Sequence, residues 1–504
     1  MSTTVSDLRN NTHAQWWKDP GLRKLNLLLL GAMLGGVGFG YDASLVNGLL
    51  ANDRWFTDLN IVGSQMEGLV IAAQSFGAIT ALFPAAYVSD LIGRRPAILI
   101  ANAAMIGTSI GQSFSRSAVT FLVTRAILGF FNVCVIVSTN ALVAELSHPR
   151  QRPQVTALSN TFFYVGGIIA AWASYGALSI QSSWTWRLSV ILQCCWPVAQ
   201  STAMVFVPES PRWLVLKGRG DEAKQVLAQY HANGAVDDDL INFEHREILA
   251  AVEAEEREAA YSWLALFSNQ GNLRRSFLTL FLGLTSQWVG NGIISYYLAP
   301  VLKTVGIGSS SQQLAINGGL QVFNLFMSVP AALMAERLGR KRLLLASAGG
   351  MAIFMALLTA CSATYARTGD HNSGTAVIAF IFCFFGSYDI GFTPIPLLYV
   401  SEIASTHLRT KYVSLYWMST AVALCFNQYV NPIAFDAITW RYYIVYIAVL
   451  CPVMVVLYFF APETKGRTLE EVAAIFEPEI AENLARADDD EHKSATTVEQ
   501  REWA

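Results

Sequence analysis

Charge is what this sequence has least of. Of its 504 residues only 14% are charged, whereas 53% are hydrophobic. A soluble globular protein carries about a quarter of its residues as charges. The deficit is typical of a chain whose surface faces lipid. The net charge of -3 leaves no basic excess for a nucleic-acid partner.

Several chemical signatures are also absent. The seven cysteines lie in apolar runs, without metal-ligand spacing or a disulfide framework, so we expect no metal site. No Walker loop is present, so we expect neither ATP-driven transport nor a cofactor. Residues 1–24 are polar and lack the short apolar core of a cleavable signal peptide. We therefore expect the first apolar run to direct membrane insertion.

Long apolar runs dominate what is present. A helix needs about 20 mostly apolar residues to cross a bilayer. Six such runs precede a polar gap and six follow it, so the sequence predicts twelve transmembrane helices in an all-α membrane protein. The runs are 25–41, 68–89, 96–114, 126–144, 153–186, 188–208, 276–302, 304–335, 343–366, 373–401, 412–435 and 442–461.

Basic residues are concentrated in alternate loops, which sets the expected orientation. They follow the even-numbered runs, as with Arg94 and Arg95 after the second. The positive-inside rule then places these loops and both termini in the cytoplasm of a cell-membrane protein. The polar gap contains amphipathic helical patterns at 221–231 and 240–258. We expect a segment 1–23, a bundle 24–208, a helical linker 209–275, a second bundle 276–461 and an acidic tail 462–504.

Three motifs occur twice, in the same order. Residues 90–95 (DLIGRR) recur as 336–341 (ERLGRK), and Glu145 with Arg152 recurs as Glu402 with Arg409. Residues 208–212 (PESPR) recur loosely as 462–467 (PETKGR). The repeats predict two pseudo-symmetric six-helix bundles with a site at their interface near the bilayer midplane.

With these motifs the chain resembles the sugar porters of the major facilitator superfamily over roughly residues 20–470. PESPRW at 208–213 together with PETKGR at 462–467 is specific to that family. The stretches 287–292 (QWVGNG) and 427–432 (NQYVNP) resemble its fungal lactose and cellobiose permease branch. The resemblance implies the major facilitator fold and transport of a small molecule, not enzyme catalysis.

Three charges lie inside the predicted spans, within an apolar run or directly at its end, namely Asp42, Arg125 and Asp389. Such residues usually face the bundle interior and are functional. The resemblance gives Asp42 and Arg125 the role of proton coupling. The alternative is a permanent ion pair that fixes two helices. Asp389 matches no family position, and it either lines a vestibule, titrates, or snorkels to the surface.

The repeated loop motifs are expected to form cytoplasmic gates. Asp90 would pair with Arg94 and Arg95, Glu145 with Arg152, and Glu209 with Arg212, and the second half would repeat these pairs. Such pairs would hold one state of the transporter and break in the other. Static capping of the loops is the alternative. The predicted gate residues are Asp90, Arg94, Arg95, Glu145, Arg152, Glu209, Arg212, Glu336, Arg340, Glu402, Arg409 and Glu463.

The family's sugar contacts are only partly present. Gln287 matches a family glutamine, whereas Leu397, Thr420 and Ala421 replace a tryptophan, a glutamine and a second tryptophan, which indicates a roomier site. Interhelical hydrogen bonding is the alternative role for each amide, and Asn431 fits that alternative better than Gln287 does. The predicted substrate-binding residues are Phe39, Asn160, Ser286, Gln287, Asn291, Tyr296, Tyr297, Leu397, Thr420, Ala421 and Asn427.

The sequence thus predicts a proton-coupled symporter of a disaccharide or hexose that works by alternating access. Its partners would be the sugar, protons and the lipid bilayer, and we expect a monomer. A transporter of a fungal secondary metabolite and a non-transporting nutrient receptor are the alternatives.

Overall fold

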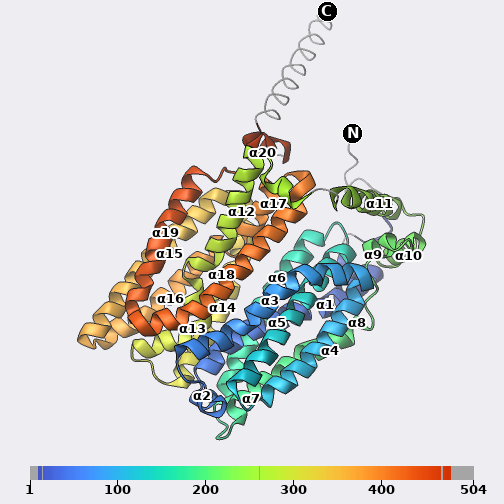
Figure 1. Ribbon diagram of the computed structural model, residues 1–504. Coiled ribbons are helices and arrows are strands. Elements are labelled where there is room, and N and C mark those ends of the chain that lie inside the picture. The colour runs from blue at the N-terminus through green and yellow to red at the C-terminus, as the bar shows by residue number, and fades with distance from the viewer. Residues whose placement is uncertain (1–9, 14, 260–261, 467–468, 478–504) are drawn as a thin grey trace, which may run out of the picture.

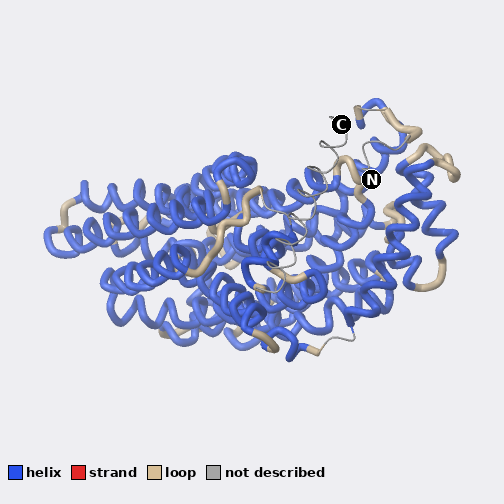
Figure 2. Tube along the Cα trace, turned by 90° about the horizontal axis from the view of Figure 1, so that it is seen from above, coloured by secondary structure: helices blue, strands red, loops and turns tan. Residues whose placement is uncertain are grey.

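The computed structural model describes residues 10–13, 15–259, 262–466 and 469–477. Within these ranges the chain is helix and connecting loop, as Figure 2 shows. The helices fall into two groups that stand side by side in Figure 1, separated in sequence by a short helical linker. The expected all-α architecture is confirmed.

The first group of long helices, here called the first half, precedes the linker. Its helices extend beyond the apolar runs because polar residues at the ends complete their outer turns, as Asp19 does by capping α1 through the Leu22 amide. The helices are α1 (Pro20–Leu50), α2 (Asp53–Leu59), α3 (Ser64–Ile92), α4 (Arg94–Ser113), α5 (Ala118–Leu146), α6 (Arg152–Ala177), α7 (Trp184–Ile191) and α8 (Cys195–Met204), with the 3-10 turn Leu192–Cys194 joining the last two.

The second half follows the linker and repeats this order. Two of its spans are broken: α12 gives way to α13 at Gly290, which has φ 103°, and α16 gives way to α17 before Pro394. The helices are α12 (Gln270–Trp288), α13 (Asn291–Thr304), α14 (Ser310–Leu338), α15 (Arg340–Thr368), α16 (His371–Gly391), α17 (Ile395–Ile403), α18 (Arg409–Ile438) and α19 (Tyr442–Phe459).

The linker contains α9 (Pro211–Leu216), α10 (Gly220–His231) and α11 (Asp239–Ala259), so both amphipathic patterns are confirmed as helices. These helices, with α20 (Leu469–Phe476), lie at one end of the molecule, which we call the linker end. The opposite end, with α2, is the far end. In Figure 1 the two halves converge towards the far end and diverge towards the linker end.

Length and apolar content identify eight membrane-span candidates among the described residues, and one of them, 409–459, comprises both α18 and α19. The helix α4, the pair α7–α8 and α14 complete a series of twelve spans. Of these, the pair α7–α8 is divided by the 3-10 turn into two short helices of 8 and 10 residues. The chain is a multi-pass membrane protein.

Candidate functional site

The three intramembrane charges predicted from the sequence are all buried. Asp42 and Arg125 are each 2% exposed and Asp389 is 1% exposed. Burial at this depth excludes snorkelling of Asp389 to the surface, so that alternative is wrong. Asp389 lies close to the end of α16.

Asp42 is held by amides and not by an ion pair. Its Oδ2 accepts a hydrogen bond from Nδ2 of Asn132 on α5 at 2.8 Å and one from Nε2 of Gln74 on α3 at 3.3 Å. Arg125 acts on Asp42 only electrostatically, and its Nε and Nη2 atoms are buried without a hydrogen-bond partner. The structure thus shows the predicted acid and arginine close together but unpaired.

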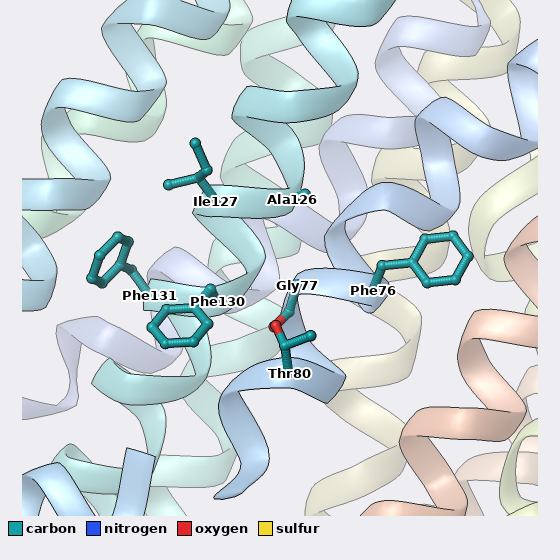
Figure 3. Close-up of a pocket in the computed structure, with 7 residues that line it drawn as sticks. All are labelled: Phe76, Gly77, Thr80, Ala126, Ile127, Phe130 and Phe131. Carbon is teal, nitrogen blue, oxygen red and sulfur yellow. The ribbon is translucent and has the colours of Figure 1, made fainter. Parts of the chain in front are cut away.

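Close packing of α3 on α5 places these amides. A side-chain carbon at Gly77 would collide with the backbone oxygen of Ala126, and one at Gly129 would collide with that of Gln74. Asn132 follows Gly129 by one helical turn and therefore lies on the same face of α5. Figure 3 shows Gly77 and Ala126 where the two helices meet, beside an apolar groove on the outer surface.

Asp389 joins the two halves. Its Oδ1 accepts from the Tyr164 hydroxyl of α6 at 3.1 Å and from the Thr393 hydroxyl at 2.8 Å. The Asn324 amide of α14, in the orientation that satisfies both its atoms, donates to Oδ2 at 3.3 Å. Tyr164 belongs to the first half and the other three residues to the second, so this cluster lies at their interface.

A second set of contacts joins the halves nearer the far end. Asn47 of α1 donates to the Ser295 oxygen at 2.6 Å and accepts from the Leu298 amide at 3.1 Å. Between these two residues Tyr297 has non-helical angles, φ -128° and ψ 29°, so Asn47 satisfies backbone groups that the kink in α13 exposes. Ser75 of α3 also donates to Oε1 of Gln428 at 2.5 Å.

The predicted substrate amides surround the break between α12 and α13. Gln287 is half-buried, and its side chain makes no hydrogen bond to other described residues, so it can bind a ligand. Asn427 donates to the backbone oxygen of Gln287, and Asn291 donates to the Tyr388 hydroxyl at 3.1 Å. Tyr388 in turn donates to the Ser286 oxygen at 3.0 Å.

The other predicted contacts are distributed over both halves. Phe39 is 39% exposed and its ring packs on Phe163, with centroids 5.6 Å apart. Tyr297 is buried and donates to the Gln428 oxygen at 2.5 Å. Thr420 is buried with an unpartnered hydroxyl. Tyr296, Leu397 and Ala421 are half-buried, and Asn160 lies on α6 with its side chain outside the described residues.

Asn431 is engaged by the protein itself. Its Oδ1 accepts from the Tyr442 hydroxyl at 2.9 Å and from the Tyr446 hydroxyl at 2.8 Å. These contacts link α18 to α19, so the interhelical role preferred for this amide is confirmed.

At the linker end, the gate motifs of the first half form one network. Arg94 pairs with Asp90 at 2.8 Å and with Glu145 at 3.1 Å. Glu209 accepts from the backbone amides of Arg94 and Arg95, at 3.1 and 3.2 Å. The predicted pair of Glu145 with Arg152 is wrong, because Arg152 is exposed at the start of α6 and Glu145 instead binds Arg94 and the Ser210 hydroxyl.

Three contacts of this network recur in the second half. Arg340 pairs with Glu402 at 2.8 Å, and its backbone amide donates to Glu463 at 2.9 Å. The Thr464 hydroxyl donates to Glu402 at 2.5 Å, as Ser210 does to Glu145. Arg409, like Arg152, is not the partner of its expected carboxylate, and its Nε and Nη2 are buried without partners. The side chain of Glu336 lies outside the described residues. The side chain of Arg212 interacts with another group of the protein.

Sequence reasoning missed the residues that hold the buried acids, namely Asn132, Gln74 and Tyr164, and also Asn47. One signal was available. Asn132 follows Arg125 by seven residues, which places both on one face of α5 in an otherwise apolar segment. Nothing comparable identified Tyr164, because its partner Asp389 is 225 positions away.

The chain is similar in sequence to fungal transporters. It is 28% identical to the MFS-type transporter oryC of Aspergillus oryzae over 86% of this chain and 82% of that one. It is 28% identical to the MFS glucose transporter mfs1 of Aspergillus flavus over 88% of each. It is 25% identical to the high-affinity hexose transporter HXT6 of Saccharomyces cerevisiae, over 90% and 82%.

The fold matches solved structures of a bacterial transporter. The inward-open xylose transporter XylE from E. coli superposes with a TM-score of 0.76 at 22% identity, covering 90% of this chain and 100% of that one. A sugar-bound structure of the proton:xylose symporter XylE gives 0.72 at 23%, covering 90% and 99%. These matches confirm the major facilitator fold. The model of the family described as "Sugar (and other) transporter" matches residues 28–476, so the chain belongs to that family and is a transporter, not an enzyme.

Proposed function

We propose that the chain is a proton-coupled sugar symporter that works by alternating access, with the linker end and both termini in the cytoplasm of a cell membrane. The single observation that carries the proposal is the state of Asp42. A buried acid that lies near an arginine, yet is bound by neutral amides, can change partner and protonation together.

The geometry suggests how sugar and proton share one cycle. Asp42 belongs to α1, which also carries Asn47, the residue bound to the kinked backbone of α13. The substrate amide Gln287 lies just before the break that starts α13. A shift of α1 against α13 therefore alters the acid's surroundings and the sugar site at the same time.

The names of the relatives support a sugar as the substrate. The Aspergillus flavus protein is called a glucose transporter, the yeast protein a hexose transporter, and the E. coli structure a proton:xylose symporter. We propose a disaccharide or a hexose, with the lipid bilayer and protons as the other partners and the monomer as the working unit. We also retain the lactose and cellobiose permease branch as a proposal.

A metabolite transporter is the second candidate. Leu397 and Ala421 are half-buried where the family pattern has tryptophans, which leaves room for a larger, less polar molecule. The oryC and criB relatives of Aspergillus are named only as MFS-type transporters, without a sugar.

Uptake of a panel of labelled sugars by a transporter-deficient host tests the proposal. Symport predicts that at least one sugar is concentrated inside, and that a proton uncoupler abolishes the concentration step. Uptake of a sugar that stops at equal concentrations would contradict coupling. Absence of uptake of every sugar would favour the metabolite transporter.

A further inference from the structure

The partners of Asp42 differ in what they can bind. A guanidinium only donates hydrogen bonds and is positively charged, so Arg125 favours the ionised carboxylate and cannot accept the hydrogen bond of a protonated Asp42. A side-chain amide both donates and accepts. Rotating the Asn132 amide by 180° presents its oxygen, which can accept the hydrogen bond of a protonated Asp42. An amide can therefore satisfy Asp42 in both protonation states.

In the structure, Asp42 is hydrogen-bonded to the Asn132 amide. Asn132, itself 2% exposed, donates at 2.8 Å to the Oδ2 atom that also receives Gln74. That leaves Oδ1 of Asp42 as the atom available for a proton. Arg125 is equally buried, but two of its nitrogens make no hydrogen bond. Buried donors are normally hydrogen-bonded, so the two unpartnered nitrogens of Arg125 are available for an acceptor that they lack in this state.

Resting on the proposed function, we propose that Asn132, assisted by Gln74, is the positioning residue that holds Asp42 while it carries the proton, and that Arg125 takes over when the proton has left. Asp42 then exchanges an amide for a guanidinium once per cycle. Neither state leaves the acid unsatisfied in the bilayer, where an unpaired polar group is costly.

The local packing fits a fixed amide and a moving acid. The lack of side chains at Gly77 and Gly129 lets α3 and α5 pack backbone to backbone, which places Gln74 and Asn132 next to each other. Asp42 approaches that surface from α1. Asp42 and Arg125 act on each other electrostatically. The other ionisable groups that act on this pair are Tyr41, beside Asp42, and Tyr296 and Tyr297 of α13. Movement of α1 relative to α5 is thus sufficient to change the partner of the acid.

The test replaces the amide by a side chain of similar size that cannot hydrogen-bond. In Asn132→Leu the protonated acid loses its partner. We expect sugar accumulation to fall about ten-fold or more and the pH profile of uptake to change, while exchange of sugar across the membrane stays within about two-fold of wild type. Exchange does not require net proton movement.

A matched control comes from α4. Asn102 is 1% exposed, and its Nδ2 donates to Gln200 at 3.0 Å, away from Asp42. Asn102→Leu should cost comparable thermal stability in detergent but leave the pH profile unchanged. If both leucine variants shift the profile alike, the effect is general destabilisation and the proposal is wrong.

A double-mutant cycle separates a positioning role of Asn132 from a packing role. If Asn132→Leu folds poorly, Asn132→Ser takes its place in the cycle. If Asn132 acts through Asp42, adding its substitution to Asp42→Asn should have no further effect on the rate or the pH profile of sugar exchange. Additive losses would overturn the proposal. If the wild type couples sugar to protons and Asn132→Leu shows the same uncoupler-sensitive accumulation, this inference alone is wrong. If the wild type does not couple sugar to protons, the proposed function is wrong and this inference with it.

Discussion

Asn427 occupies the space that a side chain at Gly292 would need. A side-chain carbon at position 292 would lie 2.8 Å from Nδ2 of Asn427, which donates to the backbone oxygen of Gln287. The amide at the break between α12 and α13 is therefore supplied by α18, and Gly292 leaves the space for it.

Gly292→Ala should therefore displace Asn427 and weaken substrate binding. Loss of a buried hydrogen bond costs about 1–3 kcal/mol, or roughly 5- to 150-fold in affinity. Binding of labelled sugar to purified protein measures it. Gly107→Ala is the control, because a side-chain carbon there meets nothing within 4 Å. Equal affinities in the two variants would contradict the assignment of Asn427.

Gln287→Ala should lower substrate affinity more than Asn431→Ala does. The Gln287 side chain is free to bind a ligand, whereas Asn431 is bound to Tyr442 and Tyr446. Asn431→Ala should instead lower thermal stability by about 1–3 kcal/mol, because two hydroxyls lose their acceptor. The proposed sugar site would be wrong if the two variants bound substrate equally well.

The same positions show what sequence could and could not predict. The apolar runs predicted the spans, because length and composition are local properties. Within the gate motifs, Glu145 was assigned to Arg152, seven residues away, whereas its partner Arg94 lies 51 positions away. Partners on different helices depend on how the helices pack, which no local pattern contains.

The buried acids illustrate the same limit. Asp42 and Asp389 were identified because a charge in an apolar run is costly. Their partners Asn132, Gln74 and Tyr164 are neutral, and neutral polar residues are common in such runs. The sequence therefore indicated where the chemistry lies without indicating which groups hold it.

A disaccharide should compete for transport better than glucose does. Leu397, Thr420 and Ala421 replace bulkier residues of the family pattern. A hexose would therefore leave part of the apolar surface of the site uncovered, and each Å² left uncovered forfeits about 25 cal/mol of binding free energy. Ala421→Trp should shift the preference towards the monosaccharide. Inhibition of labelled uptake by each unlabelled sugar measures this, and the size argument fails if glucose outcompetes every disaccharide in the wild type.

Stability should fall as the pH is lowered through the range in which His148 would titrate. Burial, with His231 and Arg150 nearby, lowers the pKa of His148 to about 3 from its ordinary 6.5. The unfolded chain binds the proton below about 6.5 and the folded chain does not, so stability is present above that pH and is lost between about pH 6.5 and 3. The loss at pH 5 is about 2 kcal/mol. Thermal unfolding of wild type and His148→Gln at pH 7.5 and 5 checks this, and an equal pH dependence in both would contradict it.

The driving force for accumulation is large. One proton that moves down about 100 mV and about one pH unit releases ~2.3 plus ~1.4 kcal/mol, enough for roughly 500-fold accumulation. The proposed function assigns this coupling to Asp42. The variant Asp42→Asn keeps the size of the side chain and, like the protonated acid, both donates and accepts hydrogen bonds, but it cannot release a proton.

The most direct test is to measure the steady-state ratio of internal to external labelled sugar in cells that express wild type or Asp42→Asn, together with sugar-induced proton uptake and sugar exchange. The account predicts that wild type concentrates the sugar, whereas Asp42→Asn only equilibrates it, without proton uptake and with exchange retained. An Asp42→Asn variant that still concentrates sugar and still takes up protons would contradict the account.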